Sequence, residues 1–221
     1  MENKNKAFTL TELLLSLGIV GVLAVMVIPS LVGHVYNRVY SNQIKSMSST
    51  IENLAQDELL TKATRDMSLT DFKSASTLLT TKHFSISKKC SASSALKDCW
   101  NTTAASGKKQ SKYKTLKGKA SSITNPGDTV ILTNGVMFGY TPVDNGGKTT
   151  GYVIMDVNGV DGPNIYGRDV FAFYVTSKGY VDDEVLNDSD VSVETKIADC
   201  KKGNALRCFG ALKDNSWKMD Y

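Results

Sequence analysis

An apolar run from Leu13 to Gly33 constrains this chain most, because its 21 residues include no charged side chain. As an α-helix it would reach about 30 Å, the thickness of the hydrocarbon core of a bilayer. Glu12 stands directly in front of the run. A carboxylate at membrane depth costs on the order of 2.5–3.5 kcal/mol, so an acid in this position is a candidate functional residue. The sequence therefore predicts a membrane-spanning helix that begins at a functional carboxylate.

A short basic head precedes the run, followed by the residues Ala7-Phe8-Thr9-Leu10-Thr11-Glu12. This segment resembles the leader signal of type IV prepilins and type II secretion pseudopilins. The resemblance implies that a prepilin peptidase cleaves between Ala7 and Phe8 and methylates the new amino group of Phe8. It also implies that Glu12, the fifth residue of the mature chain, meets the amino group of Phe8 in a neighbouring subunit during assembly. The family usually has glycine before the cut, where this chain has the small residue Ala7.

Two residues of the predicted helix stand where the same family has a helix-loosening glycine and proline, namely Gly21 and Pro29. Proline lacks an N–H and clashes with the carbonyl four residues back, so we expect a kink there. The predicted division of the chain is a leader at 1–7, a transmembrane and filament-core helix at 8–33, an amphipathic continuation at 34–62 and a globular head at 63–221.

An ordinary signal anchor and a cleavable secretory signal are the alternatives to a pilin-like amino terminus. A cleavable signal needs a small-x-small site after its apolar core. No A-x-A sequence follows this core, which runs into Ile28-Pro29-Ser30. A plain anchor gives no reason for Glu12. The pilin-like interpretation accounts for both features.

The order of the expected elements, one long amino-terminal helix followed by several strands, predicts an α+β fold in which the helix packs on an antiparallel sheet. Asn134-Gly135 between two apolar runs is typical of a hairpin with a type I′ turn. The expected elements are a short helix at 68–80, a surface loop at 84–125, hairpin strands at 129–133 and 136–140, strands at 152–156 and 169–176, an acidic loop at 182–199 and a last strand at 217–219.

The four cysteines are Cys90, Cys99, Cys200 and Cys208. An even number of cysteines in an exported domain indicates disulfides, and three pairings are possible. We predict the two local pairs, Cys90–Cys99 and Cys200–Cys208. No C-x-x-C occurs, and neither histidine lies near a pair in the sequence, so we do not expect a zinc site at the cysteines.

One constellation has the oxygen ligands that calcium prefers: Asp156, Asn158, Asp161 and Asp169. Glycines between them permit a tight loop. The loop is not an EF-hand, because the twelfth position counted from Asp156 is Gly167. Some pseudopilins resemble this chain in carrying a calcium loop late in the sequence. The alternative is a polar turn between two strands.

Charge is unevenly distributed along the head. Ten lysines lie between residues 82 and 119 against one acid, and ten acids lie between 156 and 199 against three basic residues. The two segments would either meet across a filament interface or form two solvated loops. The lysines at 108–119 are also candidates for contact with DNA phosphates. Motifs of common enzyme classes, including G-x-S-x-G, H-E-x-x-H and the P-loop, do not occur.

These observations predict a structural subunit of a type IV pilus or pseudopilus, not an enzyme. The alternatives are a DNA-binding minor pilin of an uptake system and a membrane-anchored exported enzyme. The implied partners are other copies of the chain, other pilins, a prepilin peptidase and an inner-membrane assembly platform, with DNA for the first alternative. The implied location is the bacterial inner membrane before assembly, and a cell-surface pilus or periplasmic pseudopilus afterwards. Calcium is the one cofactor for which the sequence has candidate ligands.

Overall fold

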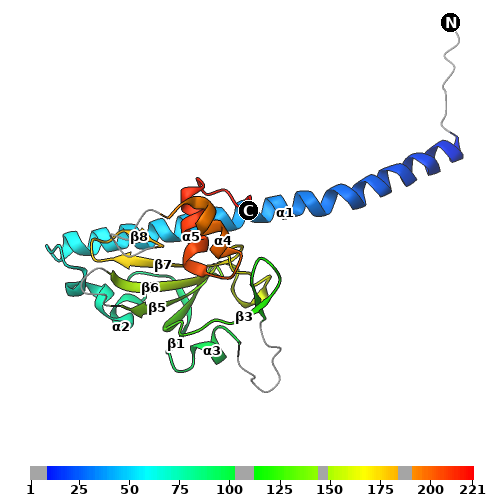
Figure 1. The fold of residues 1–221 in the computed structure, drawn as a ribbon. Coiled ribbons are helices and arrows are strands. Elements are labelled where there is room, and N and C mark those ends of the chain that lie inside the picture. The colour runs from blue at the N-terminus through cyan, green and yellow to red at the C-terminus, as the bar shows by residue number, and fades with distance from the viewer. Residues whose placement is uncertain (1–8, 103–111, 144–148, 184–190) are drawn as a thin grey trace, which may run out of the picture. The chain divides into compact units, whose positions relative to one another are not determined.

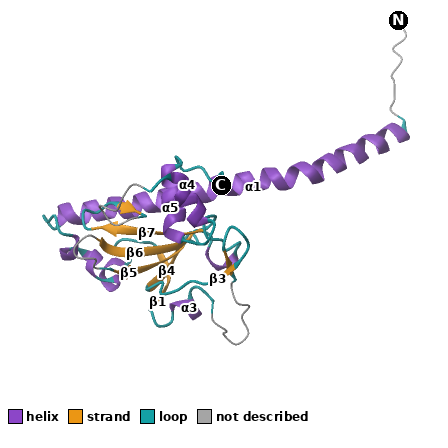
Figure 2. Cartoon of the chain, in the orientation of Figure 1, coloured by secondary structure: helices purple, strands orange, loops and turns teal. Residues whose placement is uncertain are grey.

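The computed structural model describes residues 9–102, 112–143, 149–183 and 191–221 (Figures 1 and 2). The chain forms two compact units, one up to Val39 and one from Tyr40 to the carboxyl terminus. The boundary falls inside the first helix. The predicted leader at 1–7 and Phe8 lie outside the described residues.

The first helix, α1, runs from Leu10 to Thr61, close to the predicted 8–62. The helix continues through Gly21 and Pro29 without a break. Pro29 cannot donate a backbone hydrogen bond, so the ladder lacks one bond there. A kink at these two residues stays a prediction.

The second unit is built on a six-stranded antiparallel sheet with strand order β1-β4-β5-β6-β7-β8. A separate two-stranded ribbon, β2–β3, lies beside it. The combination of a long amino-terminal helix and an antiparallel sheet confirms the predicted α+β class. The strands are β1 (Ile86–Cys90), β2 (Tyr113–Lys114), β3 (Ala120–Ser121), β4 (Asp128–Leu132), β5 (Met137–Pro142), β6 (Thr149–Asp156), β7 (Val170–Thr176) and β8 (Val181–Asp182).

The predicted hairpin is β4–β5, in which Ile131 pairs with Met137. A type I′ turn needs a positive φ at both Asn134 and Gly135. Only Gly135 has one, 88°, so the turn is not type I′. The N–H of Gly135 donates to the carbonyl of Leu132 at 3.0 Å. The connection is therefore a three-residue loop, with a β-turn followed by a glycine in the left-handed region.

The core lies between the second half of α1 and the sheet (Figure 1). Ile44, Ile51 and Ala55 of α1 are fully or almost fully buried. Consecutive residues of β5 and β7 are also buried, which means that both faces of the central strands are covered. Phe173 of β7 packs against Phe209, with ring centroids 4.9 Å apart.

The segment after α1 departs from the predicted helix at 68–80. It forms three short turns, η1 (Met67–Leu69), η2 (Asp71–Lys73) and α2 (Ala75–Leu78). The side chains of Asp66, Thr70 and Ser74 each cap the turn that follows. Each capping residue has an extended backbone conformation and ends the preceding turn, so the segment does not form one longer helix.

The prediction of a loop at 84–125 was also wrong in part. Residues 86–90 pair with β4 as the edge strand β1, and α3 (Ala95–Asp98) follows. The lysine-rich sequence of β1 concealed it, although lysines are common on edge strands. Trp100 and Tyr113 are buried, as expected of residues that pin this segment to the body.

The carboxyl-terminal part contains two helices, the first within the expected loop at 182–199 and the second around the last cysteine, and the expected strand at 217–219 is absent. Ser192 caps α4 (Val193–Cys200), and Asn204 caps α5 (Ala205–Asp214). The described part of the chain has no strand at 217–219. Trp217 instead packs edge-on against Phe209 of α5, with ring centroids 5.9 Å apart.

Candidate functional site

The first unit exposes its apolar surface almost completely. The leucine, isoleucine and valine side chains from Leu10 to Val39 are between 42% and 75% exposed. Within the described residues, α1 is the one helix long and apolar enough to cross a membrane. Surface of this kind is unstable in water and requires lipid or neighbouring apolar helices.

The start of α1 is held by a reciprocal pair of residues. The Glu12 carboxylate accepts hydrogen bonds from the backbone N–H and the hydroxyl of Thr9, at 2.8 and 2.9 Å. The N–H of Glu12 donates back to the Thr9 hydroxyl oxygen at 3.3 Å. This is a capping box, which satisfies N–H groups at the helix start that have no partner in the helix.

The capping box gives Glu12 a local structural task that the sequence analysis missed. The T-x-x-E spacing from Thr9 to Glu12 was the available signal. The predicted cleavage residues, Ala7 and Phe8, lie outside the described residues, so the structure does not place the Phe8 amino group.

The two disulfides join Cys90 to Cys99 and Cys200 to Cys208. These are the two predicted local pairs. The first connects β1 to the residue after α3, and the second connects the end of α4 to α5. All four cysteines are buried, so both bonds lie within the core of the second unit.

The predicted calcium ligands do not share one environment. Asp156 and Asp169 are fully buried, whereas Asp161 is exposed. Both oxygens of Asp169 accept backbone hydrogen bonds, from Asn164 at 2.7 Å and from Ile165 at 2.6 Å. Burial, and then the neighbouring Asp169 carboxylate, raise the pKa of Asp156 well above its ordinary range.

Asp156 also has partners on both oxygens, the Tyr113 hydroxyl at 3.2 Å and the N–H of Asn158 at 3.3 Å. Two buried amide oxygens, Oδ1 of Asn158 and Oδ1 of Asn164, have no hydrogen-bond partner among the described residues. A hard cation would use oxygens of this kind. Calcium binding at Asp156, Asn158, Asp161 and Asp169 stays a prediction.

Three described acids of the acidic segment, Asp182, Asp183 and Asp199, form ion pairs inside the subunit. Lys196 contacts the buried Asp183 at 3.0 Å, and Arg207 contacts it from the other side at 3.0 Å. Asp182 pairs with Lys213, and Asp199 pairs with Lys202. These acids are therefore not a free surface that could face the basic segment of a neighbouring subunit.

The β2–β3 ribbon, in contrast, carries four exposed lysines: Lys112, Lys114, Lys117 and Lys119. Among the residues that the structure describes, no carboxylate lies within ion-pair distance of any of them. The ribbon is therefore a concentrated basic surface without an acidic partner in the described part of the chain. We refer to these four residues as the lysine ribbon.

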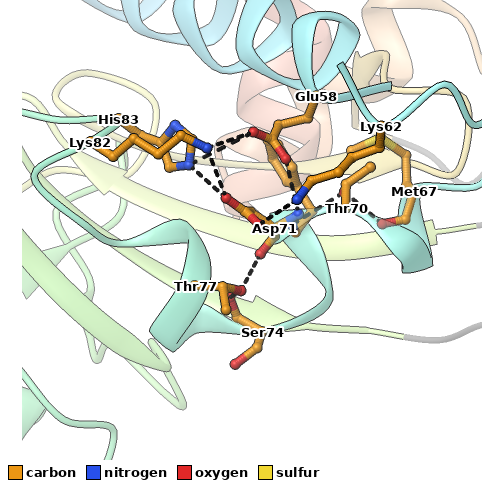
Figure 3. Close-up of polar contacts among 10 residues, drawn as sticks. Glu58, Lys62, Met67, Thr70, Asp71, Ser74, Thr77, Lys82 and His83 are labelled. Carbon is orange, nitrogen blue, oxygen red and sulfur yellow. Dashed lines mark hydrogen bonds and ion pairs between the residues drawn. The ribbon is translucent and has the colours of Figure 1, made fainter. Parts of the chain in front are cut away.

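A second polar cluster was not anticipated from the sequence. Glu58 from α1, Asp71 from η2 and His83 from the turn before β1 meet near the carboxyl-terminal end of α1, with Lys82 beside them (Figure 3). Glu58 and His83 are 25 positions apart, and no spacing rule connects them. The pKa of Asp71 is lowered, first by its hydrogen bond with His83 and then by Lys82.

Comparison with known proteins adds one match. The model of the prokaryotic N-terminal methylation motif matches residues 3–28. No curated protein and no solved structure matches the chain. The motif is the signature of type IV pilins and pseudopilins, and it confirms the resemblance of the amino terminus to this family. The amino terminus therefore carries the signature of a type IV pilin-like or pseudopilin precursor, and this motif points to a structural protein.

Proposed function

We propose that the chain is a structural subunit of a type IV pilus or pseudopilus. In this proposal it is inserted in the bacterial inner membrane as a precursor and polymerises through α1 with copies of itself and other pilins. The observation that supports this proposal is the exposed apolar surface of α1. This helix begins within the methylation motif. Lipid covers this surface before assembly, and the helices of neighbouring subunits cover it afterwards.

The surface of α1 has a suitable shape for a neighbouring helix. Gly18 has no side chain, and outside its two chain neighbours and the backbone of its own helix no atom lies within 4 Å of the position that a Cβ would occupy there. A shallow apolar depression results, lined by Leu14, Ile19 and Val22 among others. Small residues allow close approach of helix backbones in an apolar medium, where packing drives association.

Processing by a prepilin peptidase is the first step of the proposed pathway. The peptidase removes residues 1–7 and methylates the amino group of Phe8. The new amino group is a cation four residues before Glu12 in the sequence. Pairing of Glu12 with this group in a neighbouring subunit would remove a bare carboxylate from hydrocarbon. An assembly platform in the inner membrane then extracts the subunit into the filament.

Co-expression of the full chain with and without a prepilin peptidase tests the proposal. We expect intact-mass spectrometry to show a chain that starts at a methylated Phe8 only when the peptidase is present. Ala7→Gly should preserve this cleavage, and the bulky Ala7→Trp should block it. A chain that still starts at Met1 with an active peptidase, or that is cut beyond Gly33, would contradict the proposal.

A second candidate function is DNA binding by a minor pilin, and the lysine ribbon is the observation that favours it. Lysines without an acidic partner bind phosphates by releasing counterions, so affinity should fall steeply with salt. Lys117→Ala/Lys119→Ala should weaken DNA binding and reduce the salt slope by about one per lost phosphate contact. Lys202→Ala/Lys218→Ala is the matched control, with two exposed lysines outside the ribbon. Equal effects of both pairs would contradict a specific role of the ribbon.

A further inference from the structure

We propose that Glu58, Asp71 and His83 form a binding site for a divalent transition-metal ion, with zinc as the representative ion. The proposal does not depend on the function of the filament, and it involves none of the candidate calcium ligands. The site joins the end of α1 to η2 and to the turn before β1 (Figure 3).

The three potential ligand atoms have the spacing of a coordination shell. Each side chain offers one ligand atom, and all three atoms lie within 4.8 Å of one another. His83 Nε2 is 3.0 Å from Asp71 Oδ2 and 4.0 Å from Glu58 Oε1. Zinc bonds of about 2.0–2.2 Å in tetrahedral geometry place ligand atoms roughly 3.3–3.6 Å apart. The observed distances of 3.0 and 4.0 Å lie on either side of this range. Binding therefore requires side-chain adjustments in which the ion replaces the hydrogen bond between His83 and Asp71.

Two of the three ligands are almost fully buried, the third, Asp71, is 21% exposed, and neighbouring groups hold them. The side chains of Glu58 and His83 are only 3% and 4% exposed. The second oxygen of Glu58, Oε2, accepts a hydrogen bond from the backbone N–H of Asp71 at 3.3 Å. The carbonyl of Asp71 accepts one from the Thr77 hydroxyl at 2.6 Å. Outer contacts of this kind orient metal ligands before the ion arrives.

A cation already lies at this position. The Lys82 ammonium is 3.2 Å from Glu58 Oε1 and 3.3 Å from Asp71 Oδ2, the two oxygens that would bind the metal. The Lys82 side chain is 64% exposed, so it can swing into solvent without disturbing the core. The two carboxylates of Glu58 and Asp71 supply the two negative charges that a divalent ion neutralises. Lys82 therefore acts as a competitor that closes the site when no metal is bound.

The full chain in detergent, treated with a chelator and then titrated with zinc, provides the test. At free zinc of about 100 times the Kd, the melting temperature should rise by roughly 5–10 °C, because the ion binds only the folded state. Metal analysis after dialysis should find one zinc per chain. A melting temperature that zinc leaves unchanged would overturn the proposal and leave an ion-pair cluster.

Three variants make the result specific. Lys82→Ala removes the competitor and should bind zinc more tightly, an effect that a purely structural ion pair would not produce. His83→Gln should lose the zinc response, whereas His34→Gln, which changes the one other histidine of the chain, should keep it. An unchanged response in His83→Gln would place the zinc elsewhere and overturn the proposal. Should His83→Gln fail to fold, Lys82→Ala decides alone, and a zinc affinity equal to that of the wild type would overturn the proposal.

Discussion

The carboxylate of Glu12 accepts two hydrogen bonds from Thr9, one from its backbone N–H and one from its hydroxyl. Glu12 thus stabilises the start of α1, the helix to which it belongs, by accepting hydrogen bonds from Thr9. In the proposed filament the same carboxylate pairs with the amino group of Phe8. A substitution at Glu12 therefore affects two different interactions, which variants of different chemistry can separate.

Glu12→Gln keeps an oxygen acceptor and the capping box, in which glutamine also serves, but it removes the charge. We expect this variant to form a normal α1 and few filaments. Glu12→Ala should lose both properties and form few filaments, because the amino group of Phe8 is left without its proposed partner. Filament yield by electron microscopy, compared with the stability of the full chain in detergent, measures the difference. Normal filaments from Glu12→Gln would show that the charge is dispensable.

Thr9→Val is the matching variant for the cap, because it keeps the shape of the side chain and the Glu12 charge but removes the hydroxyl. Loss of such a cap costs about 0.5–2 kcal/mol of helix stability. Amide hydrogen exchange at the first turn of α1 should become faster, while filaments still form at reduced yield. Exchange at the wild-type rate would mean that the capping box does not stabilise this helix start.

Removal of the disulfides should destabilise the second unit. Closed loops with sequence separations of 9 and 8 residues contribute roughly 2–3 kcal/mol each in the chain-entropy model. We expect Cys90→Ser/Cys99→Ser and Cys200→Ser/Cys208→Ser each to lower the urea midpoint. Non-reducing peptide mapping of the wild type checks the connectivity, and a cross-pair such as Cys99–Cys200 would contradict the structure.

Asp156 should make stability depend on pH. Its pKa is raised in the folded state, so the folded chain holds this proton more tightly than the unfolded chain. Stability contributed by Asp156 is therefore present at low pH and is lost as pH rises from about 4 through the raised pKa. Asp156→Asn should stabilise the chain at neutral pH and flatten this slope, as measured by urea unfolding at several pH values. Asp161→Asn, at an exposed position, is measured under the same conditions as the control.

The same variant tests calcium. If the loop binds this ion, millimolar calcium should raise the melting temperature of the wild type and not that of Asp156→Asn. Equal melting temperatures of the wild type with and without calcium would leave the loop as a polar turn.

The buried cluster around Asp183 predicts strong coupling between two residues. Lys196→Met should cost on the order of 3–5 kcal/mol, because the carboxylate of Asp183 is buried and loses one of its two cationic partners. Asp183→Asn/Lys196→Met should recover part of this loss. A double variant no more stable than Lys196→Met would show that the pair is not coupled.

Local patterns predicted the long helix and the central strands, because each has a strong signal within a short stretch. Asn134-Gly135 located the β4–β5 hairpin, and the apolar run located the first part of α1. The turn type was wrong because it depends on the φ of Asn134, which is not positive. Strand β1 was missed because its exposed lysines do not show the alternation of a half-buried strand.

The site residues divide in the same way. Glu12 and the cysteine pairs were found from short-range patterns, and T-x-x-E would have revealed the cap at Thr9. The cluster of Glu58, Asp71 and His83 depends on three elements that only the tertiary fold brings together. Sequence spacing contains no information on such a contact, so the structure was required to find it.

N-terminal mass spectrometry of filaments sheared from cells that express the chain tests directly whether it is a filament subunit. We predict that the filaments contain this chain, that it starts at a methylated Phe8, and that Glu12→Ala removes it from the sheared fraction while it accumulates in the membrane. A chain that stays in the membrane with Met1 as its first residue, and that is absent from all filaments, would show that it is not a filament subunit.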